Sequence, residues 1–163
     1  PTTSRSWSWS TFTTKTGAWE GVPLAFLADP RFEREMEPSF AATSDVLALF
    51  SKRTGVRYPY PKYAQACVAD FPFGGMENVS ATTLTDTALG DERSRRDGGM
   101  DGLIAHEAAH QWFGDLVTCA DWSHVWLNEG FATYFGALWT EHARGADEYA
   151  IAARRAQEAY VVG

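Results

Sequence analysis

The sequence predicts an α+β fold, in which a small mixed sheet packs against several helices. Strand-like runs of residues occur before residue 85. One helical pattern lies between the first two of these runs and the later ones. After residue 100, helical spacing of apolar residues dominates the chain. With 163 residues, of which 45% are hydrophobic, the chain has the material for one core and is short for two independent domains.

Residues 1–28 have the pattern of a β-hairpin. Large and small side chains alternate over residues 7–13, as in a half-buried strand, and residues 22–27 form a second strand-like run. A turn is predicted near Gly17, since glycine adopts turn conformations without steric cost. We therefore expect two antiparallel strands at the start of the chain.

The next predicted element is a long helix from Pro30 to Gly55. Apolar residues recur there at helical spacing, although Pro38 interrupts the early turns. The Tyr-Pro-Tyr-Pro segment at residues 58–61 predicts a rigid extended connector, because a residue before proline is biased to extended conformations. Strands are predicted at residues 64–69 and 79–84, on either side of a Gly-Gly-Met-Glu-Asn segment.

The second half of the chain is predicted to be helical. A polar, glycine-containing surface loop at residues 86–99 precedes a helix that Asp101 caps and Gly114 ends. A second helix is capped by Ser123 and runs to residue 144. A third helix is predicted to begin near residue 147.

Two histidines and two glutamates in these helices have the spacing of a catalytic metal site. On a helix, His106 and His110 lie about 40° apart around the axis and one turn apart along it, so both imidazoles face one ion. Glu107 lies roughly 60° further round, close enough to take a proton from a water on the metal. Glu129 supplies a third ligand. Two nitrogens and one carboxylate leave the fourth position of a tetrahedral zinc ion open, as in catalytic sites.

The alternative is that these residues are structural. Two histidines one turn apart on an apolar helix also occur as ordinary, partly buried residues. Glu129 favours the metal site, because a carboxylate next to Trp126 and Phe131 is costly to bury unless it is paired or bound to a metal. Some zinc sites extend the pattern of His106, Glu107 and His110 by a third histidine ligand. That longer pattern is excluded here, since its third histidine would fall at Leu116.

Composition limits the class of partner. The net charge is −7, and basic residues cluster only at residues 93–96, where acidic residues flank them, which argues against nucleic-acid binding. Cys67 and Cys119 lack ligand spacing and are expected to be reduced core thiols, which favours a cytoplasmic location. We expect no membrane segment and no signal peptide in this chain, and because it starts at Pro1 we expect it to be part of a longer protein.

Three motifs together support a resemblance to a known family. HEAAH at residues 106–110 is followed after eighteen residues by the glutamate of WLNEGFATYF, and GGMEN lies upstream. With these motifs the chain resembles the aminopeptidase N family of gluzincin zinc peptidases from about residue 21 to residue 135. The resemblance implies a thermolysin-like zincin catalytic domain, with one zinc ion held by His106, His110 and Glu129, and with Glu107 as the catalytic base.

GGMEN, at residues 74–78, implies the class of substrate. In the family this segment is an edge strand of the cleft, its glutamate binds the free α-amine of a peptide, and its glycines pair with the peptide backbone. The resemblance therefore implies peptide substrates with a free N-terminus, bound by Glu77, Gly74, Gly75 and Met76. Glycine permits close approach of another backbone, and a carboxylate is a suitable partner for an ammonium group.

Two alternative functions stay open. GGMEN replaces the commoner GAMEN, as in the branch related to leukotriene epoxide hydrolysis, so a bifunctional aminopeptidase and epoxide hydrolase is one alternative. A non-catalytic peptide-binding or scaffold module of the same fold is the other. Retention of Glu107 beside an open metal site favours an enzyme, because a scaffold has no need of a base there.

The resemblance also implies that the chain is a fragment. Residues 1–28 would be the remnant of a preceding β-rich domain, and residues 29–163 the truncated N-terminal part of the catalytic domain. The missing N- and C-terminal domains would be its partners. The family's transition-state tyrosine would follow Gly163, so the chain alone is expected to be weakly active or inactive. Residues that orient the metal ligands are expected, with Thr133, Asp121 and His124 as candidates, but the favoured interpretation of each is a helix-surface or capping residue.

Overall fold

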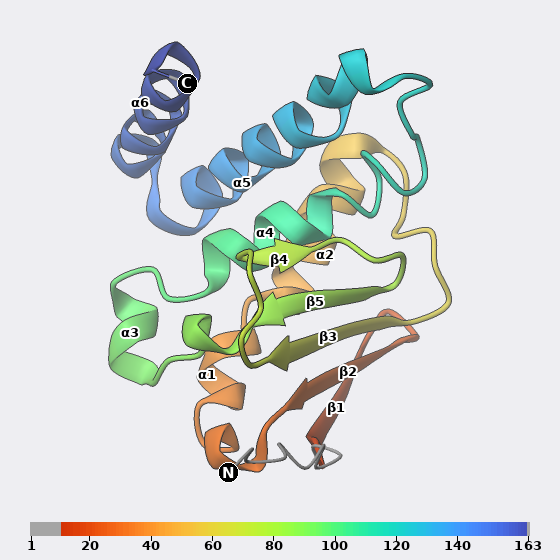
Figure 1. The fold of residues 1–163 in the computed structure, drawn as a ribbon, viewed down its shortest axis with the longest axis vertical. Helices are drawn as coiled ribbons and strands as arrows, with labels where there is room; N and C mark the ends of the chain where they lie inside the picture. Colours follow the sequence, from red (N-terminus) through yellow and green to blue (C-terminus); the bar gives the residue numbers. More distant parts are fainter. Residues whose placement is uncertain (1–10, 163) are drawn as a thin grey trace, which may run out of the picture.

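The computed structural model describes residues 11–162, which form one mixed sheet and a set of helices (Figure 1). The strands, in the order in which they pair, are β1 (Thr13–Trp19), β2 (Val22–Ala28), β3 (Tyr63–Val68), β5 (Ala81–Thr85) and β4 (Gly75–Met76). The α-helices are α1 (Met36–Phe40), α2 (Thr43–Thr54), α3 (Glu92–Arg96), α4 (Asp101–Ala109), α5 (Glu129–Arg144) and α6 (Ala146–Val162). The predicted α+β fold is confirmed.

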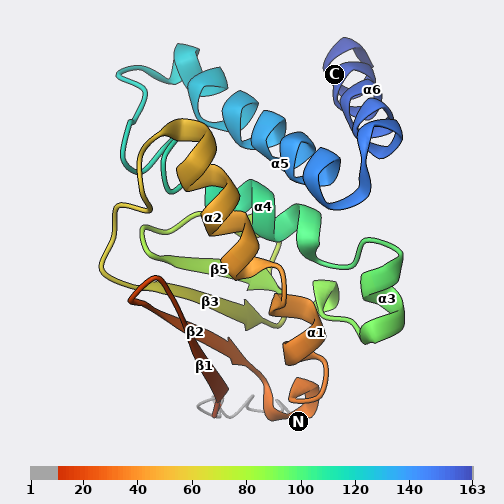
Figure 2. The ribbon, with the colours of Figure 1, turned by 180° about the vertical axis from the view of Figure 1, so that it is seen from behind.

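The helices lie on one side of the sheet. From behind, α1 and α2 cover one face of the sheet, and α4 lies beside α2 (Figure 2). α5 packs on α4, and α6 packs on α5 (Figure 1). The two histidines of the metal motif are therefore carried between the sheet and the outer helices.

β1 and β2 form the predicted hairpin, but its turn is not at Gly17. Trp19 pairs with Val22, and the turn consists of Glu20 and Gly21, which have φ of 45° and 83°. Two positive φ values fit the tight turns that join twisted antiparallel strands. Gly17 instead lies within β1. β1 shares only Thr13 with the first predicted strand, of which residues 7–10 lie outside the described residues, so the predicted position of that strand is wrong for the described residues.

The rest of the sheet is mixed, as predicted. β3 pairs in parallel with both β2 and β5. β4 pairs with β5 in antiparallel orientation, with Gly75 opposite Leu84 and Met76 opposite Thr83. GGMEN therefore begins on the edge strand of the described sheet, and the strands predicted at residues 64–69 and 79–84 are displaced by only one or two residues.

The predicted long helix between residues 30 and 55 is wrong. It is divided into a 3₁₀ turn, η1 (Pro30–Phe32), followed by α1 and α2. A continuous helix would need an amide hydrogen at Pro38, which proline lacks, whereas a helix that begins at Met36 holds Pro38 in its first turn. The predicted end is correct, since Gly55 follows α2 with a φ of 71°.

The segment predicted as a surface loop, residues 86–99, is partly helical. It contains η2 (Asp86–Ala88) and α3, which has no buried residue. Asp91 accepts hydrogen bonds from the backbone amides of Arg93 and Ser94 and so caps α3. Most charged residues of the segment are exposed, as predicted, but Asp86 is buried and pairs with Arg31 at 2.8 Å, and the prediction of a loop is wrong.

Two predicted helix boundaries in the second half are also wrong. Asp101 lies in the first turn of α4 and caps nothing, and α4 ends at Ala109, well before Gly114. Ser123 lies inside a 3₁₀ helix, η3 (Trp122–Leu127), which Asp121 caps, so α5 begins separately at Glu129. Gly145 follows α5, as predicted.

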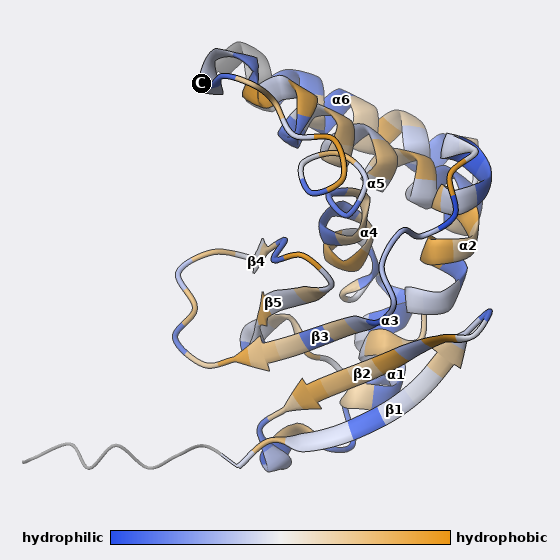
Figure 3. Cartoon of the chain, turned by 90° about the vertical axis from the view of Figure 1, so that its right-hand side faces the viewer, coloured by the Kyte–Doolittle hydropathy of each residue, from blue (hydrophilic) through white to orange (hydrophobic). Residues whose placement is uncertain are grey.

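The core joins the sheet to the helices through aromatic contacts. Phe26 of β2 stacks on Phe40 of α1, with ring centroids 4.8 Å apart. Phe50 of α2 contacts Phe135 of α5 at 5.1 Å and Trp112 at 6.2 Å. Hydropathy follows this arrangement, because β2 is largely hydrophobic whereas the outer strand β1 is largely neutral or hydrophilic (Figure 3).

Both cysteines carry free thiols, as predicted. Cys67 is buried in β3, as expected of a core thiol, but Cys119 is partly exposed, so the predicted core position is wrong for Cys119. Among residues 11–162, no helix has the length and apolar character that crossing a membrane requires.

Candidate metal centre and substrate-binding strand

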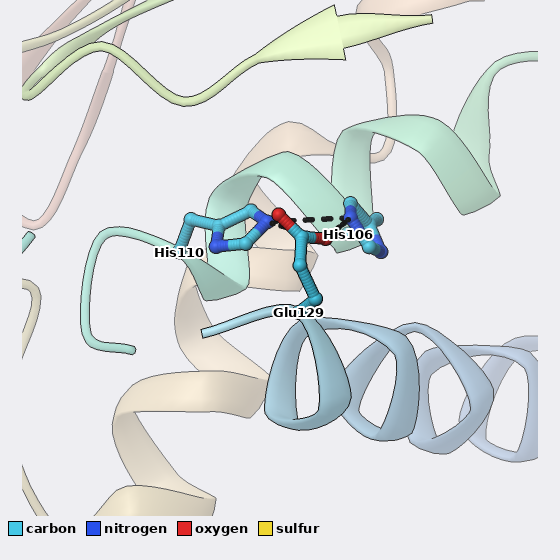
Figure 4. A group of neighbouring side chains, drawn as sticks. All are labelled: His106, His110 and Glu129. Atoms are coloured by element: carbon cyan, nitrogen blue, oxygen red, sulfur yellow. Dashed lines mark hydrogen bonds and ion pairs between the residues drawn. The ribbon is translucent and has the colours of Figure 1, made fainter. Parts of the chain in front are cut away.

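α4 and α5 bring the three predicted ligands together. His106 lies in the last turn of α4, His110 directly follows that helix, and Glu129 is the first residue of α5. Their side chains converge in the space between the two helices (Figure 4). The two Nε2 atoms lie 3.3 Å apart, and Glu129 Oε2 lies 3.3 Å from Nε2 of His106 and 3.6 Å from Nε2 of His110.

These three distances fit a zinc ion. With zinc–ligand bonds of about 2.0–2.2 Å, neighbouring ligand atoms of a tetrahedral site lie about 3.3–3.6 Å apart. The separations among His106, His110 and Glu129 fall within that interval. Two imidazole nitrogens and one carboxylate oxygen are also a typical ligand set for catalytic zinc. The residues present therefore fit the metal.

The surroundings of His106 favour its neutral, metal-binding form. The side chain of His110 is 1% exposed and that of His106 is 28% exposed. Burial and the neighbouring His110 lower the pKa of His106, and Glu129 opposes this effect. A neutral imidazole is the form that binds a metal.

Glu129 differs from its sequence-based expectation. We expected its carboxylate to be buried among aromatic residues, but its side chain is 55% exposed. The cost of burying a charge therefore gives no support to its role as a ligand. Its support comes from the distances to the two histidines and from its place at the start of α5.

A backbone carbonyl orients one histidine. Nδ1 of His110 lies 3.1 Å from the carbonyl oxygen of Phe113, and donation from Nδ1 leaves the Nε2 lone pair free for a metal. Gly114 allows this turn, since its φ of 133° is a conformation that residues with a side chain rarely adopt. The sequence suggested three other residues that could orient the ligands, namely Thr133, Asp121 and His124. Within the described residues, none of these three forms a hydrogen bond with a ligand.

Glu107 lies beside the metal ligands without belonging to their set. It is 5% exposed, and burial together with the negative charges of Glu77 and Glu129 raises its pKa to about 8. A Cβ on Gly75 would collide with its carboxyl group, so the carboxyl lies directly against β4. Glycine at this position makes the close approach possible.

The GGMEN segment lies against the same centre. Gly75 and Met76 form β4, Gly74 precedes it, and Glu77 follows it. Carboxylate oxygens of Glu77 and Glu107 and a ring nitrogen of His110 lie within 4.8 Å of one another. The structure thus brings all eight residues selected from the sequence into one site, and their roles stay predictions.

The comparisons with known proteins agree with this arrangement. Residues 39–161 match the model of the peptidase family M1 domain. The chain therefore belongs to peptidase family M1, and the predicted resemblance to aminopeptidase N and its relatives is confirmed.

Several curated relatives carry the name aminopeptidase. Aminopeptidase N of Mus musculus is 38% identical over 76% of this chain and 13% of its own length. Aminopeptidase M1-A of Oryza sativa subsp. japonica is 45% identical over 56% of this chain and 11% of its own length. Glutamyl aminopeptidase of Sus scrofa is 34% identical over 76% of this chain and 14% of its own length. The chain thus spans only a small part of the relatives it matches.

Proposed function

We propose that this chain is the zinc-binding part of an aminopeptidase catalytic domain. One zinc ion is held by His106, His110 and Glu129, whose ligand atoms have tetrahedral spacing. This spacing is the observation that carries the proposal. When bound, zinc polarises the scissile carbonyl group and makes a neighbouring water acidic enough to act as a nucleophile at neutral pH.

Glu107 acts as the general base. Its buried carboxyl takes the proton from the attacking water and later delivers it to the amine that leaves. A nearby dication favours the ionised form of a carboxyl group, which offsets the raised pKa of Glu107. Its carboxyl lies directly against β4, the strand that we expect to bind the peptide, which supports this role.

Glu77 and β4 select the substrate. A peptide that pairs with the backbone of Gly74, Gly75 and Met76 directs its N-terminus towards Glu77. The carboxylate of Glu77 then pairs with the free ammonium group, which places the first peptide bond at the metal. An acetylated N-terminus lacks the charge that this arrangement needs.

The test uses the longer protein that contains these residues. Zinc content is measured by elemental analysis, and hydrolysis is compared for an alanyl or leucyl amide and its N-acetylated form. We expect about one zinc per chain and strong preference for the free amine. A protein that binds zinc and peptides but cleaves neither substrate would instead be the non-catalytic module, and one without zinc would contradict the whole proposal.

A further inference from the structure

Gln111 connects the metal ligands to the substrate-binding segment. It directly follows His110 and is fully buried. Its Oε1 accepts a hydrogen bond from the backbone amide of Ser80 at 2.7 Å, and its Nε2 donates to the backbone carbonyl of Glu77 at 3.1 Å. The hydroxyl of Tyr58, which donates to the carbonyl of Lys62 at 2.9 Å, lies 3.4 Å from the same Oε1. One side-chain amide thus holds both ends of the segment from residue 77 to residue 80.

That segment has a conformation that needs support. Ser80 has a φ of 60°, which is uncommon for a residue other than glycine. Its carbonyl oxygen accepts a hydrogen bond from the amide of Ala64 on β3, which fixes its position on the sheet side. Gln111 fixes the other side, so the segment is held between the sheet and the turn that carries His110.

We propose that Gln111 is a positioning residue that sets the distance between the amine anchor Glu77 and the metal ligands. An enzyme that removes a single residue needs this distance to match the length of one residue. Gln111 follows a ligand by one position and bonds to the backbone of the anchor itself, so it couples the two directly. This inference rests on the proposed aminopeptidase function.

A second buried glutamine provides a matched control. Gln65 of β3 is also fully buried, and its Oε1 accepts a hydrogen bond from Thr43 at 2.7 Å. It has no hydrogen bond with the segment from residue 77 to residue 80. The substitutions Gln111→Met and Gln65→Met each keep the side-chain length and remove a buried amide, but only the first one releases the anchor.

The experiment measures three quantities in the longer protein: zinc content, hydrogen exchange at the Ser80 amide, and kcat and KM for an alanyl amide and its N-acetylated form. For Gln111→Met we expect unchanged zinc, faster exchange at Ser80, and a preference for the free amine reduced about tenfold or more, mainly through KM. For Gln65→Met we expect the wild-type preference and wild-type exchange at Ser80.

Gln111→Leu is the second variant, for use if Gln111→Met does not fold. It removes both hydrogen bonds without adding a titratable group, so we expect faster exchange at Ser80 and a reduced preference for the free amine. If either foldable variant keeps the wild-type preference, or loses it only as much as Gln65→Met, Gln111 has no positioning role. If wild-type protein shows no preference for the free amine, the proposed function fails, and this inference fails with it.

Discussion

Glu107 is the residue whose environment is least explained by folding alone. It is 5% exposed and forms no side-chain hydrogen bond with another described residue. Burial of a carboxylate without a partner is unfavourable, and the raised pKa of about 8 is one sign of this cost. Such a group beside a metal centre is typical of a catalytic acid or base.

Glu107→Gln separates proton transfer from metal binding. The substitution keeps the volume and removes the base, so we expect unchanged zinc content and a kcat lower by about 10²–10⁴. Elemental analysis and steady-state kinetics on the longer protein measure both quantities, with Glu92→Gln on the exposed helix α3 as control. Loss of zinc would place Glu107 among the ligands, and an unchanged kcat would exclude it as the base.

The two thiols provide a test of burial. Burial and the negative charge of Asp86 raise the pKa of Cys67 to about 12, whereas Cys119 is partly exposed. We expect iodoacetamide at pH 8 to label Cys119 in the native chain and to label Cys67 only after denaturation. Mass spectrometry of tryptic peptides identifies the labelled site. Native labelling of Cys67 at the rate of Cys119 would contradict the position of β3 in the core.

Single residues also show how far the sequence predicts the site. His106, Glu107 and His110 share one helical segment, so their arrangement follows from helix geometry. The bonds of Gln111 link positions 31 and 34 residues apart, and these depend on the path of the whole chain. The orienting carbonyl of Phe113 is a backbone group, for which no side-chain pattern exists.

At the scale of elements, β2, β3 and β5 were better predicted than β1 and the helix boundaries. Alternation over a few residues is enough to locate β3 and β5, because each needs only its own pattern. The three elements between residues 30 and 54 were predicted as one helix, since apolar spacing continued across the break between α1 and α2 at residues 41–42. The turn at Glu20 and Gly21 was missed because Gly17 offered a stronger glycine signal nearby.

Replacement of glycine by alanine is expected to change the free energy of unfolding in opposite directions at two positions, one after a helix and one within a helix. Gly55 ends α2 at a φ of 71°, so Gly55→Ala introduces backbone strain and should lower the free energy of unfolding by about 1 kcal/mol. Gly102 lies within α4, and the position that a Cβ would take there is open. Gly102→Ala should therefore raise the free energy of unfolding by about 0.5–1 kcal/mol. Urea denaturation measures both variants. A gain for Gly55→Ala would contradict the left-handed end of α2.

At the scale of the whole molecule, zinc is expected to tie α4 to α5. Ligand atoms from both helices lie within 4.8 Å of one another, so a metal that binds only the folded chain should stabilise it. At a free zinc concentration of a hundred times Kd, the gain in the free energy of unfolding is about 2.7 kcal/mol. Thermal melts with zinc and with chelator measure the shift. Glu129→Gln is a suitable control, because its exposed side chain contributes little to the metal-free fold. We expect that variant to lose most of the zinc-dependent shift, and an unchanged shift would remove Glu129 from the site.

The last prediction concerns the chain in isolation. Apolar side chains that precede α5 are exposed, with Trp122 79%, Trp126 58% and Val117 65% accessible, so this apolar surface is open to water in the described part of the chain. The resemblance also implies that a transition-state tyrosine lies after residue 163, and loss of one such donor costs about 10²–10³ in kcat. We therefore expect the zinc-loaded chain to be at least about a hundredfold less active than the longer protein. Comparison of kcat/KM for a leucyl amide measures this difference. Equal values would show that residues 1–163 contain every group that the reaction needs, and that the exposed tryptophans cover no part of the active site.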